Sequence, residues 1–198
     1  MSESLILLLI LVLGYLLGSL NAAVIVGKVY RKDIRNFGSK GAGLTNTLRI
    51  LGKSAALFVL VGDVLKGIIA ALIGLYFGGY VGLLTAGAGA VIGHNWPVYF
   101  GFKGGKGVLT AGAVLFMANW VVALLCLVFF VIVVVLTRYV SLGSIGTSVF
   151  GAAISFVPAF GNAAPFYVFT SLMAAIIIIK HRENIKRLIL GEENKLKL

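Results

Sequence analysis

Long apolar segments constrain this chain more than any other feature of its sequence. Of its 198 residues 60% are hydrophobic, whereas soluble domains are about 45–50% apolar. Three segments, 4–29, 54–77 and 108–137, exceed the roughly 20 residues that cross a bilayer as one helix. Further apolar segments cover 79–95, 140–158 and 165–180. Because backbone polar groups in lipid must be satisfied within the segment, the sequence predicts an all-α, polytopic integral membrane protein with a single domain, 1–198.

Basic residues indicate which loops face the cytoplasm. The 17 Lys and Arg residues concentrate in 28–53, in the loop 102–107 and from Lys180 onward. Since such loops lie on the cytoplasmic side, an even number of spans separates 102–107 from the tail. Four intervening spans give seven in total, with the N-terminus outside and the C-terminus in the cytoplasm, and two give five. We favour seven, because Asn119 and the 158–165 region both offer breaks. Basic residues beside spans also account for the net charge of +11, so we expect no nucleic-acid partner.

The loop 102–107, with the sequence Phe-Lys-Gly-Gly-Lys-Gly, suits an anion. Glycines let successive backbone N–H groups converge, and such a nest binds anions. Lys103 and Lys106 add positive charge, and a helix that starts near Gly107 adds more. The pattern indicates a phosphate site, although a basic loop that only fixes topology remains the alternative.

A second polar segment precedes the 54–77 segment. Its glycines predict a flexible turn, within which Ser39, Thr45 and Asn46 can donate hydrogen bonds. Arg49 can bind a phosphate through two parallel hydrogen bonds. The alternatives are a turn role for Ser39 and a helix-capping role for Thr45 or Asn46.

Two pairs of residues and one histidine are charged or polar and lie within or beside the apolar segments. Asp63 and Lys66 are spaced i, i+3. An unpaired charge at bilayer centre costs roughly 2.5–3.5 kcal/mol, so we expect a structural ion pair between them. His181 and Asn184 are also spaced i, i+3 and would face one way on a continuing helix, unless the tail is only a basic amphipathic helix on the membrane surface. His94 lies at the end of the apolar segment 79–95, where its role can be merely to cap the helix or to pack against its end.

Other chemistries find no support in the sequence. It has no Cys/His cluster for zinc, no paired carboxylates, no Gly-x-Ser-x-Gly elbow and no P-loop. We therefore expect neither a metal nor a cofactor. The basic and hydroxyl-bearing residues that the sequence places on one membrane face suit phosphorylated substrates.

Four groups of residues, in order along the chain, resemble the bacterial glycerol-3-phosphate acyltransferases of the acyl-phosphate-dependent, integral-membrane type, the PlsY family. They are Gly38-Ser39 with Gly43, Thr45-Asn46 and Arg49; Gly62-Asp63 with Lys66-Gly67; Gly93-His94 with Pro97 and Phe102–Gly107; and His181-Arg182 with Asn184-Ile185 and Arg187-Leu188. The chain departs from the family pattern at Lys40 and Gly41, where Gly-Asn is usual.

The resemblance implies an enzyme that transfers an acyl group from acyl phosphate to the 1-position of sn-glycerol 3-phosphate, which yields 1-acylglycerol 3-phosphate and inorganic phosphate. This is the first step of bacterial phospholipid synthesis. The resemblance also implies a seven-span protein of the bacterial inner membrane, with its active site at the cytoplasmic face. Its partners would be membrane lipids and, functionally, the enzyme that makes acyl phosphate, without a stable protein partner.

Residue by residue, the resemblance implies two sets. The expected catalytic residues are Ser39, Arg49, His181 and Asn184. The expected phosphate-binding residues are Gly38, Thr45, Asn46, His94, Lys103, Gly104, Gly105 and Lys106.

Two other functions were weighed against this one. A transporter of phosphate or a phosphorylated metabolite would suit the glycine-rich spans and the Asp63–Lys66 pair. However, the polar residues gather on one face and not at the midplane between inverted repeats. A CDP-alcohol phosphotransferase would need an acidic metal-binding cluster, which the sequence lacks.

Overall fold

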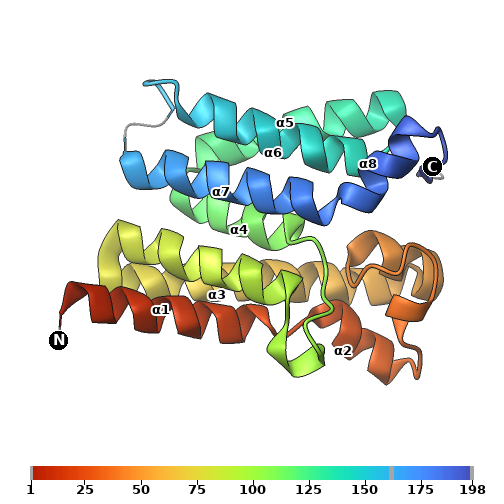
Figure 1. Cartoon of the computed structure of the whole chain (residues 1–198), viewed down its shortest axis with the longest axis horizontal. Helices are drawn as coiled ribbons and strands as arrows, with labels where there is room; N and C mark the ends of the chain where they lie inside the picture. The colour runs from red at the N-terminus through yellow and green to blue at the C-terminus, as the bar shows by residue number, and fades with distance from the viewer. Residues whose placement is uncertain (1, 161–162, 197–198) are drawn as a thin grey trace. The chain divides into compact units, whose positions relative to one another are not determined.

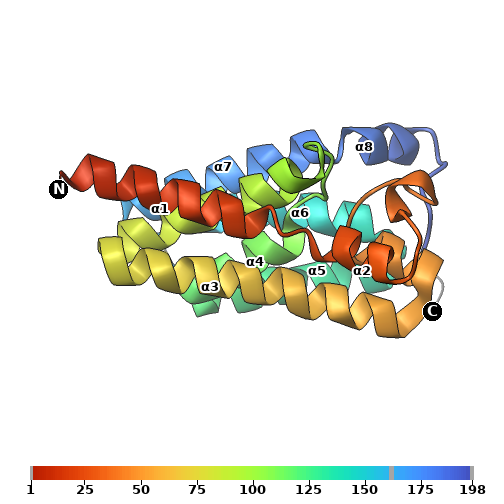
Figure 2. The same ribbon diagram turned by 90° about the horizontal axis from the view of Figure 1, so that it is seen from below.

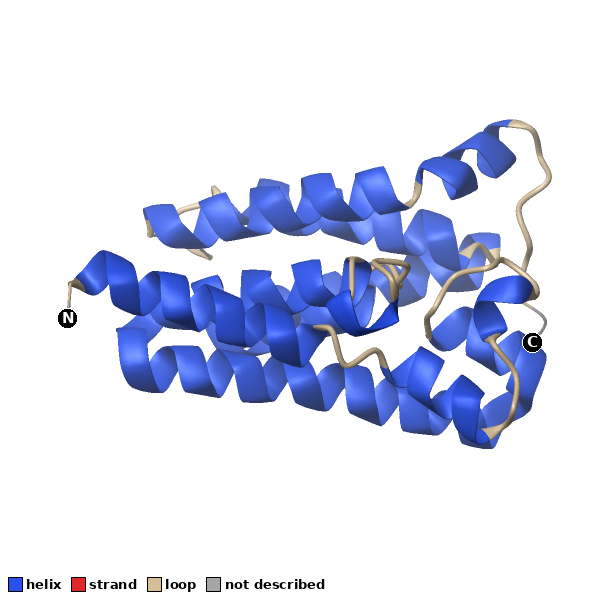
Figure 3. Ribbon diagram, turned by 60° about the horizontal axis from the view of Figure 1, so that its bottom comes forward, coloured by secondary structure: helices blue, strands red, loops and turns tan. Residues whose placement is uncertain are grey.

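The computed structural model of the chain describes residues 2–160 and 163–196, and these form helices and loops without a strand (Figure 3). The α-helices are α1 (Glu3–Gly18), α2 (Ala22–Val29), α3 (Leu44–Asn95), α4 (Val108–Ala118), α5 (Trp120–Thr137), α6 (Val140–Ser155), α7 (Ala164–Lys180) and α8 (Arg182–Ile189). Two short 3-10 helices are η1 (Ile34–Asn36) and η2 (Val98–Phe100). The all-α fold class is thus confirmed. The chain divides into two compact units, residues 1–117 and 118–198.

The first apolar segment is not the continuous helix that we predicted over 4–29. Helix α1 ends at Gly18, and α2 begins after Asn21. The side-chain oxygen of Asn21 accepts a hydrogen bond from the Val24 backbone N–H at 3.1 Å. A side-chain oxygen at this position satisfies an open N–H of the first helical turn, so Asn21 starts a new helix inside the segment.

Helix α3 is one element with two interruptions. The backbone is non-helical at Gly52 and again at Gly78 and Gly79, where φ is −139° and +58°. Glycine adopts the positive φ of the second turn residue at little cost. The chain doubles back there, as Figure 2 shows for the yellow part of α3, and the two arms, 53–77 and 80–95, correspond to the predicted segments 54–77 and 79–95.

Small residues let α1 lie close along α3 in the first unit (Figure 1). Gly14 and Gly18 of α1 face the α3 backbone, and Gly89 and Gly93 of α3 face the α1 backbone, each without room for a methyl group. Ile10, 2% exposed, packs in the same interface. Close backbone approach through glycine and alanine is the usual way in which membrane helices associate. Helix α4 joins α3 through Thr110, whose hydroxyl donates to the Asp63 carbonyl at 3.2 Å.

The second unit contains α5, α6, α7 and α8. The predicted turn at Asn119 is present: its side-chain oxygen caps α5 by accepting from the Val122 N–H at 3.1 Å. Residues 108–137 therefore form two helices. Phe129 of α5 stacks on Phe150 of α6 with ring centroids 4.7 Å apart. The hydroxyl of Ser155 hydrogen-bonds that of Thr170 at 2.8 Å, which links α6 to α7. In the predicted loop 159–164, Gly161 and Asn162 lie outside the described residues.

Helix length and composition identify the candidate membrane spans. Within residues 2–160 and 163–196, three stretches are long and apolar enough to cross a bilayer, namely Glu3–Val29, Leu44–Phe100 and Trp120–Thr137. The bent pair α7 and α8 makes a fourth candidate if it counts as one span. Helices α4 and α6 are apolar but shorter.

Candidate active site

A single buried amide organises the loop that carries Ser39, residues 30–43, which we call the Ser39 loop. Asn46, 3% exposed, accepts a hydrogen bond from the Ser39 backbone N–H at 3.0 Å. Its side-chain nitrogen donates to the backbone carbonyls of Ile34, Phe37 and Gly41 at 2.9, 3.1 and 3.1 Å. The amide is therefore committed to the loop. It holds Ser39 in place.

Gly38 is required by the same packing. Its φ is +58°, and a methyl group there would collide with the Asn46 side-chain oxygen. Lys40 also has a positive φ, at +58°, which is uncommon for a residue with a side chain. The Ser39 loop is thus a tight turn wound around Asn46.

Ser39 and Arg49 keep their functional groups available. Among the described residues, neither the Ser39 hydroxyl nor the Arg49 guanidinium has a hydrogen-bond or ion-pair partner. Ser39 is half-buried, whereas Arg49 is exposed one turn after Asn46 on α3. A guanidinium with all its N–H groups open to solvent can bind an incoming phosphate without first breaking a protein contact. Thr45 is half-buried beside them.

The second loop, residues 96–107, is anchored to the end of α3, and we call it the Lys103 loop. The Gly105 N–H donates to the His94 carbonyl at 3.1 Å. A side chain on Gly104 would collide with that carbonyl, and one on Gly105 with the His94 ring and the Ala42 carbonyl. These two glycines therefore permit close packing. The N–H of Gly105 is used inside the protein, in the anchor to His94.

Lys103 is exposed in this loop, and Lys106 and Gly104 are half-buried. Gly107, with φ +76°, precedes the first residue of α4, as the sequence predicted for the start of a helix there. The loop thus offers two ammonium groups and a helix N-terminus near one another in sequence.

Beneath the Lys103 loop lies a buried cluster of three ionisable residues. Lys66 Nζ is 2.8 Å from Asp63 Oδ1, 2.8 Å from His94 Nδ1 and 3.3 Å from the Leu20 carbonyl. The ammonium therefore hydrogen-bonds His94 and the Leu20 carbonyl and forms an ion pair with the Asp63 carboxylate. Because Nδ1 of His94 accepts from Lys66, we assign the ring proton to Nε2. His94 is 3% exposed, so it supports the loop from within.

Asn21 connects this cluster to both loops, and sequence reasoning missed it. Its side-chain nitrogen donates to the carbonyl of Ala42 at 3.5 Å and to that of His94 at 3.4 Å. Asn21 is fully buried. The available signal was an asparagine inside an apolar segment, since buried polar groups in membrane proteins need partners.

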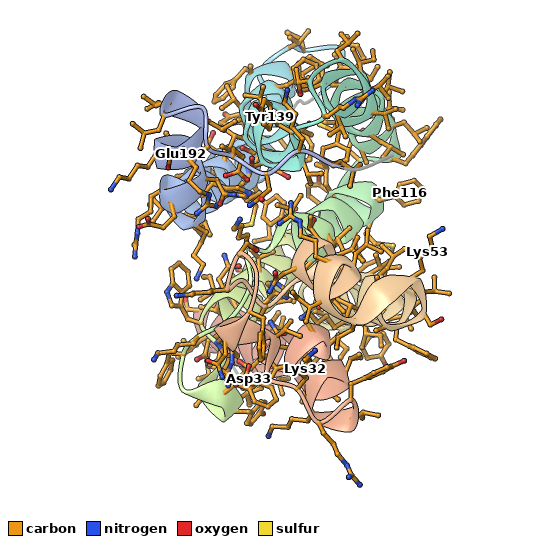
Figure 4. The ribbon with its side chains drawn as sticks, turned by 90° about the vertical axis from the view of Figure 1, so that its right-hand side faces the viewer. Lys32, Asp33, Lys53, Phe116, Tyr139 and Glu192 are labelled. Carbon is orange, nitrogen blue, oxygen red and sulfur yellow. The ribbon has the colours of Figure 1, made fainter. Side chains whose placement is uncertain are left out.

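A surface clamp joins the two loops. The Arg35 guanidinium forms a two-pronged ion pair with Asp33, with Nη2 to Oδ2 at 2.8 Å. Its Nη1 donates to the Phe100 and Lys103 carbonyls at 2.9 and 3.3 Å. The hydrogen bonds from Arg35 lower the pKa of Asp33, so this carboxylate stays ionised at neutral pH and is a weak base. Asp33 and its neighbour Lys32 are labelled in Figure 4.

In the second unit, the chain bends at His181. Helices α7 and α8 meet at 61°, so the expected continuous helix through His181 and Asn184 is wrong. The ring Nδ1 of His181 lies 2.8 Å from the Ile177 carbonyl. A carbonyl can only accept, so Nδ1 carries the proton and Nε2 is the basic nitrogen of the neutral ring.

Glu193 orients Asn184, and sequence reasoning missed this contact as well. The Asn184 side-chain nitrogen donates to one carboxylate oxygen of Glu193 at 2.9 Å, and Arg187 Nε donates to the other at 2.8 Å. The tail then returns to the corner between α5 and α6, where Lys195 lies over the Tyr139 ring. Figure 4 labels Tyr139 and Glu192 at the two ends of this return.

Ser141, in the first turn of α6, has a hydroxyl without a hydrogen-bond partner among the described residues. It is 6% exposed. Helix α6 contacts α8, which carries Asn184. A buried hydroxyl that finds no protein partner is available to a ligand, and nothing in the sequence alone distinguished Ser141 from the other serines of α6.

Comparison with known proteins decides the family. Residues 8–191 match the family model described as glycerol-3-phosphate acyltransferase. The chain belongs to this family. A glycerol-3-phosphate acyltransferase of Thermoanaerobacter pseudethanolicus is 47% identical over 93% of both chains, and one of Clostridioides difficile is 43% identical over 96% of this chain and 95% of its own.

Solved structures agree with the family assignment. A crystal structure of PlsY, an integral membrane glycerol 3-phosphate acyltransferase in its glycerol 3-phosphate form, is 38% identical with a TM-score of 0.90 over 96% of both chains. A second structure, in the lysophosphatidic acid form, is 37% identical with a TM-score of 0.87 over 96% of this chain and 95% of its own. The resemblance that the motifs indicated is confirmed. The chain is an integral membrane acyltransferase, and the transporter alternative is set aside.

We predict that replacing Lys66 destabilises this acyltransferase strongly. In Lys66→Met the Asp63 carboxylate stays buried without its cation, which costs about 3–5 kcal/mol. The double variant Asp63→Asn with Lys66→Met removes both charges and should be less destabilised than the single variant. Thermal unfolding of the purified protein in detergent measures this.

Lys53→Met is the matched control, because Lys53 is an exposed cation on the same helical element (Figure 4). It should unfold at the wild-type temperature. Equal unfolding temperatures for Lys66→Met and Lys53→Met would contradict the structural importance of the buried cluster.

Proposed function

We propose that this acyltransferase moves an acyl group from acyl phosphate to the 1-position of sn-glycerol 3-phosphate, which gives 1-acylglycerol 3-phosphate and inorganic phosphate. The observation that carries the proposal is the likeness to a solved enzyme in forms named for glycerol 3-phosphate and for lysophosphatidic acid, the acceptor and the product. Acyl phosphate as donor is the finer part of the proposal. It rests on the family resemblance of the motifs and on the supply of basic groups for two phosphates.

The proposed site residues are those that the family resemblance implies. Ser39, Arg49, Lys103 and Lys106 would bind phosphate, with Gly38 and Asn46 shaping the turn and His94 and Gly105 supporting the second loop. His181 and Asn184 would complete the catalytic set. We include Thr45 and Gly104 as residues that line the phosphate loops.

The chemistry needs positioning more than a strong base, because an acyl phosphate is already an activated mixed anhydride. The C1 hydroxyl oxygen of the acceptor bonds to the acyl carbon while the bond from that carbon to the bridging oxygen breaks. The departing phosphate takes the hydroxyl proton. Cations around the two phosphates would hold them close despite their repulsion and stabilise the charge that develops.

The protein's own bases fit this substrate-assisted route. The Asp33 carboxylate is paired with Arg35, and Asp63 is paired with Lys66. His94 accepts from Lys66 within the buried cluster. Asp33, Asp63 and His94 would each lose a stabilising contact by taking a proton or by turning toward a substrate. The donor's own phosphate, whose oxygens lie beside the attacked carbonyl, is the acceptor of the proton that we propose in preference to these groups and to Nε2 of His181.

We further propose a multi-pass protein of the bacterial inner membrane with seven spans, its N-terminus outside and its active site at the cytoplasmic face. Seven helical segments support this number: α1 with α2, the two arms of α3, and α4 to α7. Helix α4 has 11 residues and is about 16 Å long, so this span would need local thinning of the bilayer. A functional link to an acyl-phosphate-producing enzyme, without a stable complex, follows from the proposed donor.

Cysteine labelling at Arg138 distinguishes seven spans from five. In the seven-span arrangement Arg138 faces the cytoplasm, because α4 and α5 cross separately; with five spans, 108–137 crosses once and Arg138 faces outward. We expect Arg138→Cys, in a Cys126→Ser background, to react with a membrane-impermeant thiol reagent only after the cytoplasmic face is opened. Glu3→Cys and Glu192→Cys serve as the outer and inner references. Labelling of Arg138→Cys in intact cells would contradict the seven-span proposal.

An activity assay in detergent tests the function. The purified protein should form 1-acylglycerol 3-phosphate from acyl phosphate and glycerol 3-phosphate, and it should not use acyl thioesters. Arg49→Ala should reduce the rate by about a hundredfold to a thousandfold, the usual cost of losing a charge-stabilising donor. Arg49→Lys should recover little, because a point charge lacks the two-pronged geometry.

Lys53→Ala is the control for loss of one exposed cation near Arg49 and should retain wild-type activity. Transfer from thioesters at the acyl-phosphate rate would contradict the proposed donor. Full activity of Arg49→Ala would remove this residue from the proposed site.

A further inference from the structure

The hydrogen bonds of Arg35 bridge the Ser39 loop to the Lys103 loop. It lies in η1, within the Ser39 loop, and its Nη1 donates to the Phe100 carbonyl at 2.9 Å and to the Lys103 carbonyl at 3.3 Å. A guanidinium nitrogen of this kind carries two N–H groups, so each carbonyl can receive one. Arg35 thereby joins the two loops.

Asp33 holds the Arg35 side chain in this position. Arg35 Nε donates to Asp33 Oδ1 at 2.9 Å and Nη2 to Oδ2 at 2.8 Å, while Asp33 also accepts from the Arg35 backbone N–H at 3.0 Å. The planar guanidinium presents its donors in a fixed fork. With one edge of the fork fixed on Asp33, Nη1 is oriented toward the Lys103 loop.

The contacted part of the Lys103 loop has a conformation that needs such support. Between the two bonded carbonyls, Gly101 and Phe102 both have positive φ, at 66° and 59°. Phe102 is an exposed residue with a side chain in the left-handed region, a conformation that is uncommon for such residues. On its far side the loop is fixed by the Gly105 N–H bond to the His94 carbonyl at 3.1 Å. Arg35 thus supplies the second anchor of the segment that carries Lys103.

We propose that Arg35 is a positioning residue for the phosphorylated acceptor: by holding the Lys103 carbonyl, it fixes the Lys103 ammonium relative to the Ser39 loop. Arg35 does not contact the substrate in this role. The proposal rests on the proposed binding of glycerol 3-phosphate by these two loops. Arg35 is not among the expected catalytic or phosphate-binding residues. The proposal gives it the role of setting the distance between the two loops.

The test compares Arg35→Ala with Arg31→Ala in steady-state kinetics. Arg31 is an exposed cation of the same loop and has no hydrogen-bond or ion-pair partner among the described residues, so its loss controls for charge alone. In Arg35→Ala we expect the KM for glycerol 3-phosphate to rise about tenfold, the effect of losing a charge-assisted hydrogen bond. The kcat and the KM for acyl phosphate should stay within about threefold, because ground-state binding of the acceptor is lost and not the chemistry.

Arg35→Lys separates geometry from charge. It keeps the cation but cannot hold Asp33 and both carbonyls at once, so its KM should stay close to that of Arg35→Ala. A wild-type KM in Arg35→Lys, or equal KM increases in Arg35→Ala and Arg31→Ala, would overturn the proposal in favour of a simple charge effect. A fall in kcat with an unchanged KM would also overturn it.

The mobility of a spin label on the Lys103 loop reports whether Arg35 restrains this loop, and the measurement does not depend on activity. Tyr99, in η2, is 52% exposed, and Tyr99→Cys in a Cys126→Ser background accepts a nitroxide. We expect Arg35→Ala and Arg35→Lys to increase the label mobility and Arg31→Ala to leave it unchanged. Unchanged mobility in both Arg35 variants would overturn the proposal.

If the unmodified enzyme transferred no acyl group to glycerol 3-phosphate, the proposed function would fail, while the label would still decide whether Arg35 holds the loop. If Arg35→Ala does not insert, Arg35→Lys decides both readouts.

Discussion

The buried ammonium of Lys66 is the interaction on which the rest of the first unit depends. In an apolar helical unit, an uncompensated charge would be costly, and Lys66 forms an ion pair with Asp63 and hydrogen-bonds His94 and the Leu20 carbonyl. These acceptors come from the break between α1 and α2 and from both arms of α3. The cluster therefore ties together three helical segments that small residues have already brought close.

The same cluster also supports the Ser39 loop and the Lys103 loop. The His94 carbonyl accepts from the Gly105 N–H and, at longer range, from Asn21, which also reaches the Ala42 carbonyl. The Lys103 loop and the end of the Ser39 loop are thus fastened to one buried point, and Arg35 fastens them again at the surface. These contacts fix the backbone of the two loops, whereas the side chains of Arg49 and Lys103 remain exposed. Pre-positioned cations of this kind suit a reaction in which binding two phosphates correctly is most of the task.

Local sequence patterns predicted the helical framework well. Apolar length gave the helical segments, the Gly78-Gly79 pair and Asn119 marked real breaks, and the i, i+3 spacing of Asp63 and Lys66 predicted the ion pair that the structure contains at 2.8 Å. These features depend on residues that are close in the chain. The break at Asn21 was missed because its cap lies within a segment whose hydropathy alone indicates one helix.

The site was harder to predict, because its roles depend on partners distant in sequence. The motifs that contain Asn46 and His94 did not show that the Asn46 amide holds the Ser39 loop or that His94 Nδ1 accepts from Lys66. The bend at His181 was missed because the residues around it favour helix on both sides. Asn184 meets Glu193 only because the tail folds back after α8. Spacing identifies which residues share a helix face, whereas hydrogen-bond partners across loops become visible only in the folded chain.

Intact-mass measurement of the purified enzyme after incubation with acyl phosphate alone tests the central claim most directly. The claim is that the protein positions two phosphates for direct transfer and forms no covalent intermediate. The account predicts an unchanged enzyme mass and no burst of inorganic phosphate in the absence of glycerol 3-phosphate. A stoichiometric acyl adduct that disappears in Ser39→Ala, accompanied by a phosphate burst, would contradict it and establish a ping-pong route through Ser39.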